Sequence, residues 1–301
     1  MKKHLLFAAL FAALASTGSG GSVETNFVAD TETENPALDL FSVDASYVFE
    51  SKLSFDDDDN FGDQDALQTS IEYSHRFRLS GSLYLRAGLA YNRFDFGESS
   101  APVPDQLHSL AAIVGIDYMV GNDVGAFLQL RPGFYAEDDF DGDSFDVPIT
   151  LARIWVLQPK RLYLLTGVNV AFLRGQLPVL PILGLIWYPS DNWKVFAVVP
   201  EPRIVYSPNK NIGLWLGGQL TGGSFRTDHS DTIFPRKLSG AQVDYSEYRA
   251  GLGVDFHCGD AVTLTAAGGY AIQRRFNFER AGDDYDTDPA PYARLSLKAE
   301  F

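Results

Sequence analysis

The chain ends on Tyr292-Ala-Arg-Leu-Ser-Leu-Lys-Ala-Glu-Phe301, in which apolar and polar residues alternate without a break. Every second residue from Ala293 to Phe301 is apolar. An alternation of period two predicts a β-strand with one face in an apolar medium and the other in a polar one. This stretch therefore predicts the closing strand of a transmembrane β-barrel. We expect the barrel-assembly machinery to read its terminal residue, Phe301, as a signal.

The beginning of the chain has the pattern of a secretory signal peptide. A basic start, Met1-Lys-Lys, precedes an apolar run from Leu5 to Ala15, and small polar residues follow. The run is shorter than the roughly 20 apolar residues that a membrane helix needs. We therefore expect residues 1–15 to be a signal peptide and residues 16–38 a flexible periplasmic lead-in. Residues 39–301 would then form a barrel surrounded by the lipid of a bacterial outer membrane.

Composition excludes several classes of protein. The net charge is −15 and the isoelectric point is about 4.6, which argues against nucleic acid as a partner. Cys258 is the only cysteine, so the exported chain has no disulfide framework. No cofactor is expected, since no spacing of cysteine and histidine matches a zinc site.

Alternation continues through most of the chain. Between Leu67 and Arg78, odd positions are mostly apolar or aromatic and even positions polar, over a length that suits a membrane-crossing strand. Strands are predicted near residues 41–53, 67–78, 82–95, 108–121, 124–136, 146–158, 162–174, 179–188, 193–200, 203–208, 211–225, 242–256, 261–276 and 291–301. Longer loops are predicted near residues 54–66, 96–107, 137–145, 226–241 and 277–290. They alternate with tight turns, which is the layout of an up-and-down barrel with short periplasmic turns and long external loops.

The number of strands follows from the position of the two ends. A barrel that begins and ends in the periplasm has an even number of strands, but a single strand over residues 193–206 makes the number odd. Pro200-Glu-Pro202 interrupts that stretch, and proline cannot donate to a strand ladder. A reversal there predicts an all-β, antiparallel up-and-down barrel of about 14 strands, or of 12 full crossings plus a short hairpin.

The lipid-facing row of each strand predicts which charges face the lumen, because a charge that faces lipid costs about 2–4 kcal/mol at the bilayer midplane. Arg153 is assigned inward although both faces of its strand are apolar. Two interpretations stay open: the charges pair to fill a narrow polar interior, or opposing rows select permeating solutes. The predicted lumen-facing charges are Asp44, Glu50, Glu72, Arg76, Arg86, Asp117, Arg131, Arg153, Glu247, Arg249, Asp255, Arg294, Lys298 and Glu300.

Acidic residues gather in the predicted external loops near residues 56–65, 137–146 and 279–288. A solvated, repulsive surface is the first interpretation. Divalent cations are the alternative partner, because hard cations prefer carboxylate oxygens. Asp139, Asp141 and Asp143 are the candidate ligands, although their segment lacks the glutamate that completes a calcium loop.

Catalytic residues are not evident. His108 lies near Asp105 and Ser109 and is the best candidate for the histidine of a lipid hydrolase. No nucleophile motif surrounds any serine, so we expect no enzymatic activity.

Three motifs occur in the order Tyr188-Pro-Ser190, Pro200-Glu-Pro202 and the Gly-rich Asn211-Ile-Gly-Leu-Trp-Leu-Gly-Gly218. In this order they resemble a family of uncharacterised bacterial outer-membrane β-barrels, a domain of unknown function. The resemblance implies a fold and a location but no catalytic residues. The preferred function is a passive channel or uptake route for small solutes. The alternatives are a structural or adhesive surface barrel with cation-binding acidic loops and, less favoured, a lipid-modifying enzyme.

Overall fold

The computed structural model describes residues 37–55, 59–121, 123–175, 177–229 and 234–301. The predicted signal peptide and nearly all of the predicted lead-in lie outside these ranges. In the described residues, 14 strands form the barrel wall. They are β1 (Asp39–Phe55), β2 (Asp59–Ser80), β3 (Leu83–Phe96), β4 (Gln106–Val120), β5 (Asp123–Leu130), β8 (Ile149–Gln158), β9 (Leu162–Val170), β10 (Val179–Ser190), β11 (Trp193–Val198), β12 (Arg203–Asn209), β13 (Ile212–Arg226), β14 (Gln242–Cys258), β15 (Val262–Phe278) and β17 (Ala290–Glu300).

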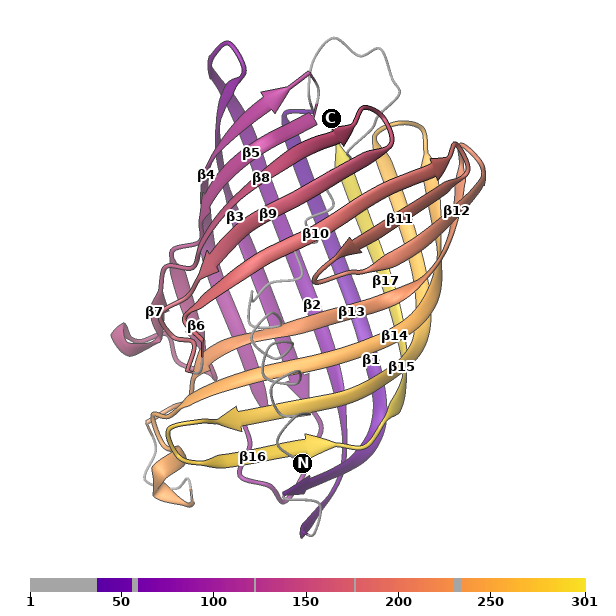
Figure 1. Ribbon diagram of the computed structural model, residues 1–301. Coiled ribbons are helices and arrows are strands. Elements are labelled where there is room, and N and C mark those ends of the chain that lie inside the picture. Colours follow the sequence, from indigo (N-terminus) through magenta and orange to yellow (C-terminus); the bar gives the residue numbers. More distant parts are fainter. Residues whose placement is uncertain (1–36, 56–58, 122, 176, 230–233) are drawn as a thin grey trace.

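The sheet closes on itself (Figure 1). Neighbouring wall strands pair antiparallel around the barrel, and the last strand, β17, pairs with β1 from Leu40↔Glu300 to Val48↔Tyr292. The alternating C-terminal stretch is therefore the closing strand, and the prediction of an antiparallel barrel of about 14 strands is confirmed. Closure removes the two sheet edges that an open sheet of this size would expose.

The remaining elements extend the wall at the end with the long loops. They are β6 (Gly133–Ala136), β7 (Phe145–Asp146), β16 (Asp283–Thr287) and the short helices η1 (Gly142–Ser144) and η2 (Arg236–Leu238). Two predicted loops are wrong in extent, because β1, β2, β15 and β16 occupy most of residues 54–66 and 277–290. Hydrogen bonding between the long partner strands continues past the apolar belt, where the alternation of side chains is no longer diagnostic.

The predicted reversal at Pro200-Glu-Pro202 is confirmed, since β11 ends at Val198 and β12 begins at Arg203. At the end of the barrel opposite the long loops, the turns are tight. Gly81 and Gly259 adopt φ of 53° and 72° there, in the left-handed region that glycine reaches without strain. Tight turns mark the periplasmic end of bacterial outer-membrane barrels.

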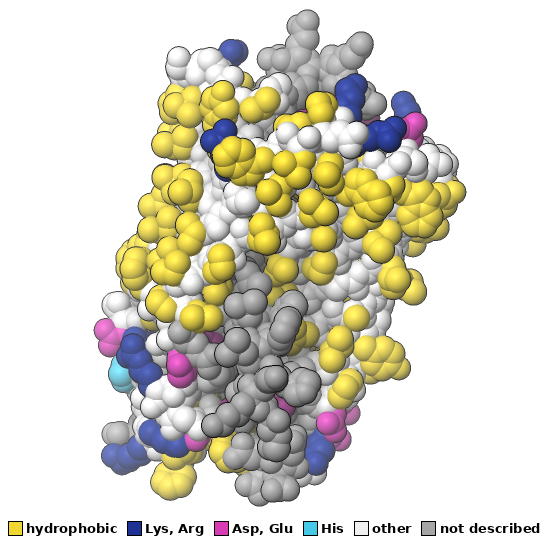
Figure 2. Space-filling view, viewed as in Figure 1, with side chains coloured by type: hydrophobic (Ala, Val, Ile, Leu, Met, Phe, Trp, Pro, Cys, Tyr) yellow, Lys and Arg dark blue, Asp and Glu magenta, His cyan; other side chains and the backbone are white. Residues whose placement is uncertain are grey.

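The two faces of the wall differ in polarity. In β4, buried and exposed residues alternate, with Asp117 at 0% exposure on the inner face and Val114 at 43% on the outer face. Apolar side chains cover the outer surface over the upper part of the view in Figure 2, and charged side chains gather near both ends. No helix among the described residues is long and apolar enough to span a membrane.

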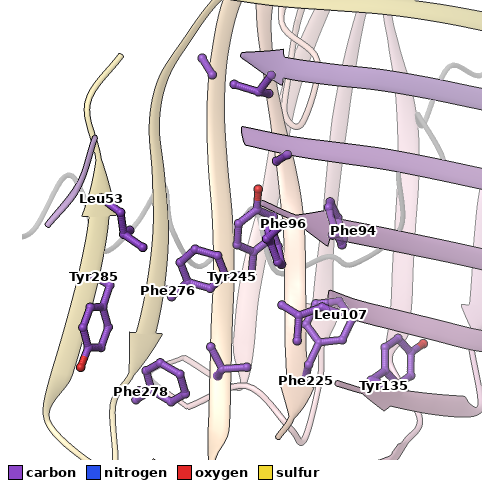
Figure 3. Packing of buried hydrophobic residues seen from close by; sticks show 14 of the residues in the cluster. Leu53, Phe94, Phe96, Leu107, Tyr135, Phe225, Tyr245, Phe276, Phe278 and Tyr285 are labelled. Atoms are coloured by element: carbon purple, nitrogen blue, oxygen red, sulfur yellow. The ribbon is translucent and has the colours of Figure 1, made fainter. Parts of the chain in front are cut away.

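The interior contains two apolar clusters. The first, at the loop end, is the outer aromatic cluster of Phe94, Phe96, Phe225, Tyr245 and Phe276 with its apolar neighbours (Figure 3). The second lies nearer the tight turns and is called the inner apolar lining: Tyr84, Met119, Val124, Phe127, Ala152, Leu165, Ile186 and Val198. Charged and polar side chains occupy much of the remaining interior.

Candidate functional site in the barrel interior

One carboxylate on β4 holds two arginines inside the barrel. Asp117 accepts from Arg76 Nε at 2.9 Å and from Arg86 Nη2 at 2.8 Å. Arg76 also donates to the carbonyl of Ala37 at 3.0 Å, which ties the beginning of the described chain to the same group. All three charges were predicted to face the lumen, and alternation in β2, β3 and β4 brings them together.

A glutamine links strands on opposite parts of the wall. Gln68 Oε1 on β2 accepts from Thr221 Oγ1 on β13 and from Arg249 Nη2 on β14, both at 3.2 Å. The strands β1, β17 and β15 separate β2 from β14 in the sheet, so these bonds cross the interior. Arg249 in turn pairs with Glu247 at 2.5 Å, and both side chains are 1% exposed.

Glu201, at the tip of the β11–β12 hairpin, also points into the barrel. Its carboxylate lies 3.2 Å from Arg294 of β17 and accepts from Gln219 Nε2 at 3.0 Å. Arg294 also donates to Asp44 of β1 at 2.5 Å. Proline on both sides of Glu201 restricts the backbone of the tip and so favours one direction for this side chain.

Several other predicted charges lie in the same interior. Arg131 donates to Glu72 at 2.9 Å, and Arg203 lies 3.6 Å from Asp255. Lys298 lines a small cavity, together with Glu201, Arg203, Trp215 and Arg294, of about 20 Å³, which has room for about one water molecule. Acids and bases are therefore mixed and paired, as one of the two interpretations expected.

Two of the predicted inward charges are wrong. Arg153 is exposed, because its neighbour Ala152 pairs with the inward Phe127, and its guanidinium lies 3.9 Å from the centre of the Trp155 ring. With apolar residues on both faces of β8, alternation could not fix the facing. Glu50 is exposed because a bulge between Val48 and Ser51 reverses the facing of the residues that follow.

Sequence reasoning did not identify Gln68, Glu201 or Arg274 as interior residues. Gln68 carries no charge, and Glu201 was assigned to a turn. The guanidinium of Arg274 is buried and bonds to Ser51 Oγ and to the carbonyl oxygen of Gln64. The adjacent arginines Arg274 and Arg275 in one strand could have signalled that one of them faces inward.

The candidate cation ligands do not form a site. Asp141 accepts from the backbone nitrogens of Asp143 and Ser144 and so caps η1. Nowhere in the described ranges do three residues of the His, Cys, Asp and Glu types gather as a metal site would need. The hypothesis that Asp139, Asp141 and Asp143 bind a divalent cation is therefore not supported.

Nearby, Glu137 joins two external loops. Its carboxylate accepts from the backbone nitrogen of Asp228 at 2.8 Å. Burial raises the pKa of this carboxyl to about 7, and the carboxylates of Asp228, Asp105 and Asp138 act in the same direction.

The candidate catalytic residues are also separated. His108 lies on the outer face of β4 and its Nε2 is 3.0 Å from the carbonyl oxygen of Asp138. Ser109 is the next residue and is buried on the inner face. The two side chains therefore cannot form a nucleophile–base pair.

The inner apolar lining faces the interior from β3 to β5 and β8 to β11, and the ion pairs of Asp117 lie beside it. Pairing sets this facing: Asp117 is directly opposite Phe127, Phe127 opposite Ala152, and Ala152 opposite Gly167. Directly paired residues lie on the same face of a sheet. The lining continues through β9, β10 and β11, where Ile182 and Phe196 pack against it.

Comparison with solved structures finds β-barrels at low identity. An outer-membrane channel from Pseudomonas putida F1 is 12% identical, with a TM-score of 0.46, over 91% of this chain and 100% of that one. A mutant of the monoaromatic hydrocarbon channel TodX, which is known from P. putida, is 10% identical with a TM-score of 0.45, over 88% and 91% of the two chains. The β domain of the Bordetella autotransporter BrkA is 14% identical with a TM-score of 0.34, over 88% and 100%.

No family model matches the chain, and no curated protein matches it. Membership of the uncharacterised family therefore stays a prediction. The location rests on the barrel itself. Leu89, Leu183, Leu252 and Leu295 are 62–70% exposed on its outer face, and a closed barrel with such an apolar belt belongs in lipid. The chain is a bacterial outer-membrane β-barrel.

Proposed function

We propose that the barrel is a passive uptake route for small solutes, and that it favours solutes with a largely apolar surface. The observation that carries this proposal is the inner apolar lining. A water-filled porin has a polar interior, whereas here apolar side chains from seven consecutive wall strands, β3 to β5 and β8 to β11, form one wall of the interior.

The interior ion pairs support the same choice of solute. Asp117, Glu247 and Arg294 each engage an opposite charge at 2.5–2.9 Å. A permeating ion would have to replace such contacts, and separating a buried pair costs several kcal/mol. Selection of ions by opposing charged rows is therefore less favoured than passage of apolar solutes along the inner apolar lining.

Neighbouring residues of β8 provide the test. Ala152 faces inward at 2% exposure, and Leu151 faces outward at 52%. Ala152→Trp should reduce the uptake of a small apolar probe, such as N-phenyl-1-naphthylamine, by cells that express the protein. Leu151→Trp adds a similar bulk to the lipid-facing side and should leave uptake unchanged. Equal uptake by both folded variants and the unmodified protein would contradict the proposal.

A heat-modifiability gel, in which a folded barrel migrates differently from the unfolded chain, establishes that each variant has folded. If Ala152→Trp does not fold, Ile186→Phe adds less volume to the same lining. The polar reference solute is a small sugar, whose uptake should be low for every variant. Protein-dependent uptake of the sugar at the rate of the apolar probe would favour a general aqueous pore instead.

A further inference from the structure

Arg153 of β8 has no part in the barrel interior or in the proposed uptake. It faces outward between Leu151 and Trp155, on a row of the wall that is otherwise apolar. A charged side chain on the lipid face of a barrel costs about 2–4 kcal/mol at the bilayer midplane and less near the interfaces. An arginine in this place therefore needs a partner, a position near an interface, or both.

The chain itself supplies no anionic partner. Within the ranges that the structure describes, no carboxylate or carbonyl oxygen accepts from the guanidinium of Arg153, whose contact is with the ring of Trp155. By contrast, Arg93 on the outer face of β3 forms an ion pair with Asp95 at 2.6 Å. The donors of Arg153 are therefore available to a group from outside the chain.

Trp155 fixes the direction of the Arg153 side chain. Trp155 Nε1 donates to Thr166 Oγ1 of β9 at 2.8 Å, which holds the indole ring in place. The guanidinium of Arg153 lies 3.9 Å from the centre of that ring, within the range of a cation–π contact. Because Trp155 is nearer than Arg153 to the end of β8, the arginine side chain extends toward the tight turns, at the periplasmic end.

Tryptophans on the outer face mark the level of the lipid headgroups at this end. Trp155 and Trp187 lie in the last turnward residues of β8 and β10, and Trp193 is the first residue of β11. All three are 42–46% exposed. Tryptophan gathers at the boundary between hydrocarbon and headgroups. The guanidinium that lies over Trp155 is therefore at the headgroup level, although the backbone of Arg153 is deeper.

The turn after β8 adds positive charge. Lys160 and Arg161 are both exposed there, whereas the neighbouring turns have an acid beside them, Asp123 and Asp191. Figure 2 shows Lys and Arg side chains near the tight-turn end, at the top of the view, next to the apolar surface. With Arg153, the β8–β9 hairpin thus carries three cations on a rim that faces lipid headgroups, and such basic clusters attract anionic lipids.

We propose that Arg153, Trp155 and the β8–β9 turn form a binding site for an anionic phospholipid of the periplasmic leaflet. The guanidinium would donate to two oxygens of the lipid phosphate, a geometry for which its planar fork is suited. The short side chains of its paired neighbours, Ala126 and Thr166, leave it accessible from the lipid. The site is independent of the proposed uptake function.

Binding of phosphatidylglycerol to the purified barrel in detergent micelles tests the site. Native mass spectrometry measures the fraction of barrels that retain one lipid molecule. Arg153→Gln keeps most of the side-chain length and removes the charge, so this fraction should fall several-fold. Arg93→Gln is the matched control, because it removes an outer-face arginine whose partner is Asp95, and it should leave the fraction unchanged. Equal retention by the unmodified protein and both variants would overturn the proposal.

Two further probes identify the ligand in the same spectra. Phosphatidylethanolamine, which has no net charge, should be retained several-fold less than phosphatidylglycerol by the unmodified protein. Inorganic phosphate at millimolar concentration should not displace phosphatidylglycerol, because it lacks the acyl chains that contact the apolar belt. Equal retention of the two lipids, or displacement by inorganic phosphate, would overturn the assignment to an anionic phospholipid. A dimer that Arg153→Gln converts to a monomer, with lipid retention unchanged, would assign Arg153 to an interface between copies instead.

Unfolding in vesicles provides a second measurement. A lipid that binds the folded barrel and not the unfolded chain stabilises the barrel. Adding phosphatidylglycerol to phosphatidylcholine vesicles should therefore raise the urea midpoint of the unmodified protein and of Arg93→Gln more than that of Arg153→Gln. If Arg153→Gln does not fold, as judged by heat modifiability, Trp155→Leu removes the platform instead and should lower both lipid retention and the rise in midpoint. An equal rise in every folded variant would contradict the site.

Discussion

At the scale of single residues, Asp117 is a charge whose loss should strongly destabilise the barrel, because its carboxylate is fully buried between two guanidinium groups. Asp117→Asn leaves two arginines without their counter-charge, and removing one partner of a buried ion pair costs about 3–5 kcal/mol. The free energy of unfolding, measured by urea titration in lipid vesicles, should fall by this amount. Asp95→Asn is the control, since the Arg93–Asp95 pair is more than a third exposed and should change stability by less than about 1 kcal/mol.

A second residue, Glu137, predicts a dependence on pH at the external loops. Its folded-state pKa of about 7 lies above the ordinary value of 4.5, chiefly because of burial. The contribution of this carboxyl to loop stability is therefore fully present below pH 4.5 and is lost as the pH rises through 7. Hydrogen exchange of residues 137–141 and 227–229, corrected for intrinsic rates, should accelerate between pH 5 and 8, by at most roughly tenfold per pH unit.

Glu137→Gln keeps an acceptor for the Asp228 nitrogen and removes the charge, so it should abolish this acceleration. Asp138→Asn removes a neighbouring exposed charge and should leave most of it. If Glu137→Gln exchanges with the pH dependence of the unmodified protein, the carboxyl of Glu137 is not the group that titrates.

Alternation of period two could predict most interior residues, because successive side chains along a strand point alternately into the barrel and out of it. It placed Asp117, Arg249 and Arg294 on the inner face of the wall without any knowledge of their partners. It failed at Glu50, where a bulge adds a residue, and at Arg153, where both rows of β8 are apolar. Sequence alone contains neither the bulge nor the pairing of Ala152 with Phe127, since both are set by the neighbouring strand.

At the scale of elements, the β11–β12 hairpin likewise has one feature that the sequence could predict and one that it could not. The reversal could be predicted from the sequence. Proline cannot donate to a strand ladder, and the barrel needs an even number of strands. The inward direction of Glu201 could not be predicted, since its partners Arg294 and Gln219 come from β17 and β13. Contacts between elements distant in sequence thus decide the role of the tip.

Glu201→Gln should loosen this tip while leaving the ladders intact. The amide can still contact Gln219 and Arg294, but it no longer neutralises the buried guanidinium. Hydrogen exchange of residues 199–203 and of 218–220, which donate to the tip carbonyls, should accelerate relative to the unmodified protein. Glu300→Gln, at the tight-turn end of β17, is the control and should leave the exchange of these segments unchanged. Unchanged exchange in Glu201→Gln would mean that the prolines alone hold the tip.

At the scale of the whole molecule, two kinds of contact fill the interior. Hydrogen bonds and ring contacts cross the barrel between β2 or β3 and β13 to β15. Apolar packing between neighbouring strands lines β3 to β5 and β8 to β11. Polar and aromatic contacts across the barrel thus fill one part of the interior, and the inner apolar lining covers another part.

The polar contacts across the barrel depend on Gln68, whose side chain joins β2 to four other strands through Ser46, Asn92, Thr221 and Arg249. Gln68→Ala removes all of these bonds and leaves the buried Arg249 guanidinium, the Ser46 and Thr221 hydroxyls and the Asn92 amide with one partner fewer each. Unfolding free energy should fall by about 1–3 kcal/mol, and water should enter the part of the interior that these bonds fill. Single-channel recordings in planar bilayers should then show a higher ion conductance than the unmodified protein. The control, Gln106→Ala, removes an exposed contact with Asp138 at the loop end and should change neither quantity. Equal conductance of Gln68→Ala and Gln106→Ala would mean that the aromatic contacts close this part of the interior without the polar ones.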